Sequence, residues 1–120
     1  MLEMDDILND FVRAWQTFDA DLIIKHLDEK FVYDSQWVFA SLDCQGYKEY
    51  IQGKFQTLKR NRITIEAEIV EDSYMGGKMM KLIQDGEAPV YYRIKLNNDN
   101  SKVIKGDLCC LLYTSDAADE

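Results

Sequence analysis

The stretch "RITIEAEIV", residues 62–70, decides the fold class of this chain. Apolar and polar side chains alternate along it, with Ile63, Ile65, Ala67 and Ile69 on one face and Thr64, Glu66 and Glu68 on the other. A period of two predicts a β-strand that is buried on one face and meets water on the other. Upstream of this stretch the apolar spacing is helical, so the chain changes here from helices to sheet.

Three further strands are predicted downstream: "KMMKLIQ" at 78–84, "PVYYRIKL" at 89–96 and "SKVIKGDLCCLL" at 101–112. The first is preceded by "MGGK", where paired glycines accept positive φ and predict a tight hairpin turn. The segments "DGEAP" and "NNDN" separate the others. This half of the chain therefore predicts four strands in hairpin succession.

The first half of the chain predicts three helices and one more strand. Helical spacing marks a first helix over roughly 3–18 and a short second helix that Asp19 caps. The strand "KFVYDSQWVF" follows at 30–39, and a third helix lies within 42–60, with its apolar stripe on Tyr47, Tyr50, Ile51, Phe55 and Leu58. This order predicts one α+β domain, with helices packed on one face of a curved antiparallel sheet.

Composition narrows the classes of function. The chain has 120 residues, with 14 basic and 22 acidic side chains that give a net charge of −8. An acidic surface whose only basic run is "KRNR" at 59–62 predicts no nucleic-acid partner. No stretch is apolar for long enough to span a membrane, and the acidic start is unlike a secretory signal, so we expect a cytoplasmic protein.

Three cysteines, Cys44, Cys109 and Cys110, show no C-x-x-C spacing. They are interpreted as small apolar residues in a reducing compartment rather than as zinc ligands. The single histidine, His26, has no second nitrogen ligand at metal-binding spacing. We therefore predict neither a metal nor a cofactor.

The segments "FVRAWQTFDADLIIKHLDEKFVYDSQW" and "LDCQGYKEYIQGKF", followed by the run of strands, resemble the NTF2-like superfamily and its SnoaL-like branch. The resemblance covers about Met4 to Cys109, and Gly46 matches a glycine that often opens the third helix in that branch. It implies a cone that admits a small molecule at its mouth. It also implies a homodimer formed through the outer face of the sheet.

The last eleven residues, "CLLYTSDAADE" from Cys110 to Glu120, resemble a translated sequencing-library adapter. This resemblance implies that the NTF2-like domain is residues 1–109 and that the native ending is not in this sequence. No function is assigned to the tail.

The resemblance also implies one catalytic candidate, because "VYD" at 32–34 aligns Asp34 with the general base of ketosteroid isomerase. A carboxylate in an apolar cone can move a proton next to a carbonyl. The other groups of that enzyme do not carry over. Phe11 stands in place of its oxyanion-binding tyrosine, and no acid lies in "PVYYRIKL". Tyr91 or Tyr92 could substitute for that acid, but only one of the two can point inward.

Strand alternation gives a competing interpretation of Asp34. Phe31, Tyr33 and Trp37 share one face of their strand, whereas Val32, Asp34 and Gln36 share the other. If the aromatic face lines the cone, Asp34 is solvated; the resemblance favours the opposite choice, and both remain open. The same rule places Asp107 on an outer face, unless a bulge turns it inward.

Seven residues are predicted to line the pocket: Trp15, Tyr33, Gln36, Trp37, Tyr50, Phe55 and Tyr92. They suit a flat, apolar ligand, although aromatic side chains also simply fill cores. His26 and Asp107 are secondary candidates. We favour a noncatalytic domain that binds a small apolar molecule. The alternative is an isomerase, cyclase or dehydratase with Asp34 as general acid/base.

Overall fold

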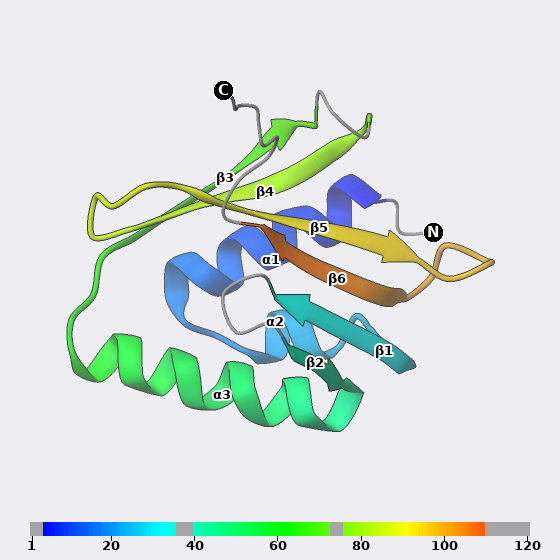
Figure 1. Cartoon of the computed structure of the whole chain (residues 1–120), viewed down its shortest axis with the longest axis horizontal. Helices are drawn as coiled ribbons and strands as arrows, with labels where there is room; N and C mark the ends of the chain where they lie inside the picture. Colours follow the sequence, from blue (N-terminus) through cyan, green and yellow to red (C-terminus); the bar gives the residue numbers. More distant parts are fainter. Residues whose placement is uncertain (1–3, 36–39, 73–75, 110–120) are drawn as a thin grey trace.

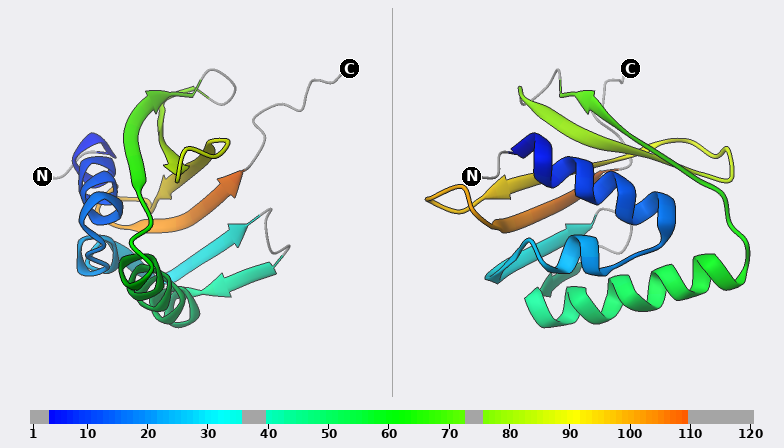
Figure 2. Two further views of the ribbon diagram at one scale, coloured as in Figure 1. Left: turned by 90° about the vertical axis from the view of Figure 1, so that its left-hand side faces the viewer. Right: turned by 180° about the vertical axis from the view of Figure 1, so that it is seen from behind.

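A computed structural model describes residues 4–35, 40–72 and 76–109 of the chain. Its elements are α1 (Met4–Thr17), α2 (Asp21–Ile24), β1 (Leu27–Ser35), β2 (Ala40–Asp43), α3 (Cys44–Arg60), β3 (Ile65–Glu71), β4 (Lys78–Gln84), β5 (Val90–Leu96) and β6 (Val103–Cys109). The helices lie on one side of a strongly curved sheet (Figures 1 and 2). The predicted α+β class is therefore confirmed.

The sheet of the described chain has six strands in the order β2-β1-β6-β5-β4-β3. The strands β3 to β6 form the predicted succession of antiparallel hairpins, and β1 joins it by pairing in parallel with β6. At the β3–β4 turn, Gly76 and Gly77 have φ of 83° and 78°, as the paired glycines predicted. Strands β2 and β3 are therefore the two edges of this sheet.

Two details of the first half differ from the prediction. The strand expected over 30–39 is β1, which ends at Ser35, and a separate short strand β2 pairs back on it. Residues 36–39 and the predicted tail 110–120 lie outside the described residues. Asp19 accepts a hydrogen bond from the Asp21 backbone, but Ala20 occupies the N-cap position of α2.

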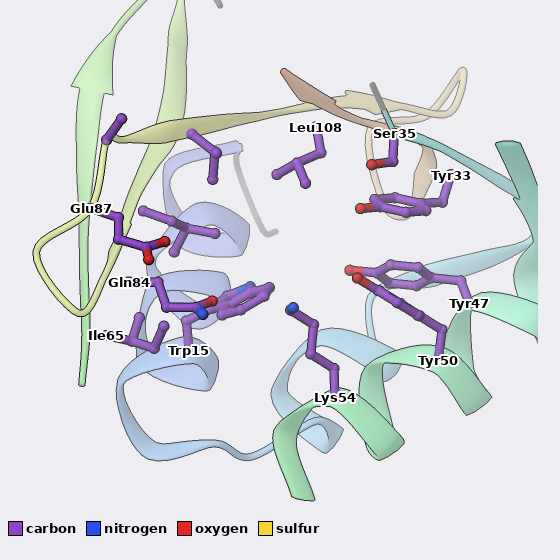
Figure 3. A pocket seen from close by; sticks show the side chains of 13 residues that line it. Trp15, Tyr33, Ser35, Tyr47, Tyr50, Lys54, Ile65, Gln84, Glu87 and Leu108 are labelled. Atoms are coloured by element: carbon purple, nitrogen blue, oxygen red, sulfur yellow. The ribbon is translucent and has the colours of Figure 1, made fainter. Parts of the chain in front are cut away.

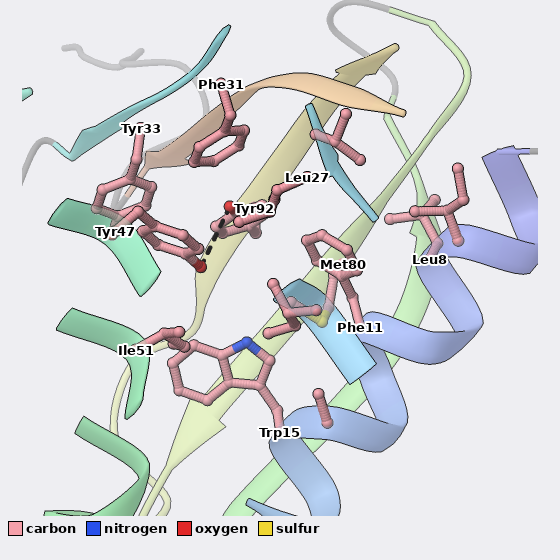
Figure 4. Packing of buried hydrophobic residues seen from close by; sticks show 14 of the residues in the cluster. Leu8, Phe11, Trp15, Leu27, Phe31, Tyr33, Tyr47, Ile51, Met80 and Tyr92 are labelled. Carbon is pink, nitrogen blue, oxygen red and sulfur yellow. Dashed lines mark hydrogen bonds between the residues drawn. The ribbon is translucent and has the colours of Figure 1, made fainter. Parts of the chain in front are cut away.

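The core lies between the helices and the inner face of the sheet. Helix α1 packs on β3 and β4, whereas α3 packs on β1 and β2. Figure 4 shows aromatic residues from the helices and the sheet meeting in this space, among them Phe11, Trp15, Tyr47 and Tyr92. The Trp15 ring also packs edge-on against Phe55, with 4.8 Å between the ring centroids. None of the described helices is long and apolar enough to cross a membrane.

Gly106 allows the closest approach in this core. A Cβ atom at this position would overlap the hydroxyl group of Tyr92 and lie 3.2 Å from the Phe31 ring. Tyr92 is 1% exposed and donates a hydrogen bond to the hydroxyl of Tyr47 on α3, at 3.3 Å. The glycine therefore leaves room for the side chain that connects the sheet to α3.

We predict that Gly106→Ala lowers the free energy of unfolding by about 1–3 kcal/mol, because the buried Tyr92 ring has no space into which to move. Urea denaturation measures the change. Gly53→Ala on α3 is the matched control: nothing lies within 4 Å of its added methyl group. Alanine is also the better helix former there, so stability should stay equal or rise slightly. Equal losses in both variants would contradict the packing role of Gly106.

Candidate functional site

A cavity of about 420 Å³ lies between α1, α3 and the inner face of the sheet. Figure 3 shows side chains from both helices and from the sheet directed into it. The lining residues are Trp15, Tyr33, Ser35, Tyr47, Tyr50, Lys54, Ile65, Leu82, Gln84, Glu87, Ala88, Val90 and Leu108. The walls are therefore mainly aromatic and aliphatic, with a small number of polar groups.

Three tyrosines form one end of the cavity. The Tyr33 ring lies 4.6 Å from that of Tyr47 and 5.8 Å from that of Tyr50, measured between centroids. Burial raises the pKa of Tyr47 and of Tyr50, so both phenols keep their protons at physiological pH. Since the Tyr47 oxygen accepts a hydrogen bond from Tyr92, its own hydrogen is available to another acceptor.

The side chain of Lys54 extends from α3 into the cavity, next to this tyrosine group. It is half-buried on α3, one turn beyond Tyr50, and Figure 3 shows its amine ending between the tyrosine hydroxyls and the indole of Trp15. Burial lowers the pKa of Lys54. No carboxylate of the described residues lies within ion-pair distance of this amine.

Trp15 forms the wall opposite the tyrosines. Its side chain is only 6% exposed, and its indole N–H has no hydrogen-bond partner among the described residues. A buried donor without an acceptor is destabilising by about 1–3 kcal/mol. The Phe55 ring packs edge-on against this indole, at an interplanar angle of 82°.

The predicted pocket residues divide into three groups. Trp15, Tyr33 and Tyr50 line the cavity. Phe55 and Tyr92 are not among its lining residues: the Phe55 ring packs edge-on against that of Trp15, and the buried Tyr92 contacts Phe11 and Tyr47. Gln36 and Trp37 lie outside the described residues.

Asp34 points away from the cavity. Tyr33 and Ser35 line it, so the alternation of β1 places the Asp34 side chain on the outer face, where it is 38% exposed. The Ser41 hydroxyl donates to this carboxylate, and the amine of Lys105 lies 3.0 Å from it. These two partners lower the pKa of Asp34. Of the two interpretations left open above, the structure follows strand alternation.

The two secondary candidates also lie outside the cavity. Asp107 is aligned with Asp34 across the β1–β6 pair on the outer face, and burial raises its pKa. His26 is 4% exposed at the border of the core, where its Nε2 lies 2.7 Å from the Asp10 carboxylate. Among the residues that the structure describes, no group of three His, Cys, Asp or Glu side chains could hold a metal ion.

Sequence reasoning missed four polar residues of the lining: Ser35, Lys54, Gln84 and Glu87. A signal existed for Lys54, because it lies seven residues after Tyr47 and four after Tyr50 and so shares their helix face. Ser35 similarly follows Tyr33 at strand spacing. Glu87 lies in the β4–β5 connection, where no periodicity indicates a direction.

Comparison with known proteins supports the fold. No protein-family model and no curated protein matches the sequence. A SnoaL-like protein of unknown function from Burkholderia thailandensis is similar in structure, with a TM-score of 0.67, 13% identity, and coverage of 87% of this chain and 90% of that one. An NTF2-like protein of unknown function from Cytophaga hutchinsonii is also similar, with a TM-score of 0.60 and 11% identity. The similarity covers 90% of this chain and 89% of that one.

A third similar structure is a Catenulispora acidiphila protein with a ketosteroid isomerase-like fold, in complex with trimethylamine. Its TM-score is 0.57 at 12% identity, with coverage of 86% of this chain and 83% of that one. At such identities the likeness establishes the fold, and the NTF2-like cone expected from the sequence is confirmed.

We predict that Lys54 titrates below the ordinary lysine pKa of 10.5, because its amine is partly desolvated. Heteronuclear NMR of the lysine side chains measures the titration, and the signal that disappears in Lys54→Met assigns the residue. A Lys54 pKa at or above the ordinary value would contradict this placement, since it would indicate a fully hydrated or ion-paired amine.

Proposed function

We propose that this chain, which has the NTF2-like fold, binds a small and largely apolar molecule in the cavity between α1, α3 and the sheet, and that it does so without converting it. The observation that carries the proposal is the lining: aromatic and aliphatic walls with a few convergent polar groups are typical of ligand sites. The volume of about 420 Å³ is also in the range of small-molecule pockets. Complex formation by the Catenulispora neighbour with trimethylamine agrees with a ligand-binding role.

The position of the acidic groups supports binding over catalysis. General acid/base catalysis needs a titratable group within hydrogen-bond reach of the substrate, with its pKa near the working pH. Asp34, the acid of the enzyme hypothesis, lies on the outer face with its pKa lowered, and the buried tyrosines have raised pKa values. Glu87 is the carboxylate among the lining residues, and its side chain is exposed.

A cavity-filling variant tests this proposal. We predict that wild-type protein binds the neutral bicyclic probe 2-naphthamide and that Leu108→Trp weakens this binding at least roughly tenfold, because the larger side chain occupies the space that the probe needs. Isothermal titration calorimetry measures both affinities. Gln56→Trp, at an exposed position of α3 outside the cavity, is the size-matched control and should bind like the wild type.

Asp34→Asn, measured alongside, tests whether Asp34 contributes to the ligand site. We expect unchanged affinity for 2-naphthamide, because the carboxylate does not reach the cavity. Weaker binding in this variant would indicate that Asp34 contributes to the ligand site. Undiminished binding in Leu108→Trp, or no binding by the wild type, would contradict the proposed function.

We also propose that the protein is a cytoplasmic homodimer that associates through the outer face of the sheet. This face carries charges of both signs on adjacent strands, with Lys105 close to both Asp34 and Asp107, and the exposed side chain of Val32 lies beside them. Such a self-complementary surface suits a twofold interface. Native mass spectrometry should give the dimer mass, and a monomer at micromolar concentration would contradict this association.

A further inference from the structure

We infer that the ligand of the cavity is an apolar or aromatic carboxylate, and that the ammonium group of Lys54 binds its acidic end. This inference rests on the proposed function, and it adds the chemical class of the ligand. It also assigns to Lys54 a role as the residue that distinguishes anions from neutral molecules of the same shape.

The first observation is the position of the Lys54 amine. Most lysines extend into water from the side of a helix, but this one is half-buried and runs along the cavity that Tyr47 and Tyr50 also line. Figure 3 shows the nitrogen inside the cavity rather than at its edge. A charge in this environment is poorly hydrated, and its interaction with an opposite charge is correspondingly stronger.

The second observation is that no residue described by the structure supplies a counter-charge to this amine. Burial alone accounts for the lowered pKa of Lys54, with no contribution from a neighbouring carboxylate. The titratable groups that share the cavity are Glu87 from the β4–β5 connection, Tyr33 from β1, and Tyr47 and Tyr50 from α3. Glu87 is exposed and forms no ion pair with Lys54, and burial raises the pKa of Tyr47 and Tyr50, so these phenols keep their protons. A ligand carboxylate would thus be the counter-ion of this amine.

The surrounding groups favour a single negative charge on an apolar body. One ammonium group balances one carboxylate, and the hydroxyls of the tyrosine end can donate to its second oxygen. A phosphate monoester carries nearly two charges at neutral pH and would leave one of them unbalanced. A cationic ligand would meet the like charge of Lys54. The indole of Trp15 and the side chains of Ile65, Leu82, Val90 and Leu108 then cover the apolar part of the molecule.

Two probes of nearly equal shape test the inference: 2-naphthoate and its neutral counterpart 2-naphthamide. We predict that wild-type protein binds the naphthoate about tenfold more tightly at low salt and neutral pH, since the ammonium of Lys54 attracts a charged carboxylate more strongly than a neutral amide oxygen. Lys54→Met keeps the apolar stem and removes the charge. It should abolish the preference while affinity for the amide persists. Lys54→Gln provides a second variant if the first is poorly folded.

Lys59→Met is the matched control, because it removes the same charge from the same helix at an exposed position outside the cavity. Its preference for the naphthoate should equal that of the wild type. The preference should also decline as the pH rises through the pKa of Lys54, because the neutral amine no longer attracts the anion, and only amide-like binding remains.

The outcomes separate this inference from the proposed function. Equal affinities for the two probes in the wild type, or a preference that survives in Lys54→Met and Lys54→Gln, would overturn the role of Lys54 and leave the cavity as a binding site for neutral molecules. Failure of both probes to bind would overturn the proposed function and this inference together. Loss of the preference in Lys59→Met as well would show that the preference comes from the general surface charge. That result would also overturn the role of Lys54.

Discussion

The hydrogen bond between the buried hydroxyls of Tyr92 and Tyr47 is the interaction on which the rest of this structure depends. It joins β5 in the middle of the sheet to α3, and both side chains are about 1% exposed. Because a buried hydroxyl without a partner is costly, the two phenols fix the separation of helix and sheet at the combined length of their side chains. Gly106 makes this arrangement possible by leaving space where any other residue would place a Cβ atom. Nearer to Trp15, side chains do not fill the space between α3 and the sheet, and this unfilled space is the cavity.

Much of this architecture can be predicted from the sequence, because a helix or strand that is buried on one face has apolar residues at a regular spacing. The strand predicted over 78–84 is β4 residue for residue, and the alternation in 62–70 correctly marks β3. Strand β2 escapes such reasoning, since four residues are too few to show a period. For Asp34 the alternation within β1 was the better guide, because it reflects burial in this chain. The alignment of Asp34 with the general base of ketosteroid isomerase was a poorer guide, because proteins that share a fold can differ in the residues of their sites.

The lining of the cavity is harder to predict than the fold, for a physical reason. Aromatic residues are buried both in cores and in ligand sites, so residue type does not distinguish Phe55, which packs against Trp15, from Tyr50, which lines the cavity. Polar residues within an apolar stripe are more informative, because burying them is costly unless a partner is present. Lys54 is such a residue on α3. The apolar stripe alone identifies the buried face of the helix, and the lysine within it marks the part of that face that lines the cavity.

An NMR titration tests the central claim, that this cavity holds a ligand, most directly. The indole N–H signal of Trp15 is measured during addition of 2-naphthoate, and a Trp37→Phe variant distinguishes it from the signal of Trp37. The account predicts that the Trp15 signal shifts and saturates with the affinity measured by calorimetry, because the indole forms a wall of the cavity beside Lys54. A Trp15 signal that stays in place while signals of outer-face residues move would show that the molecule binds elsewhere, and would contradict the account.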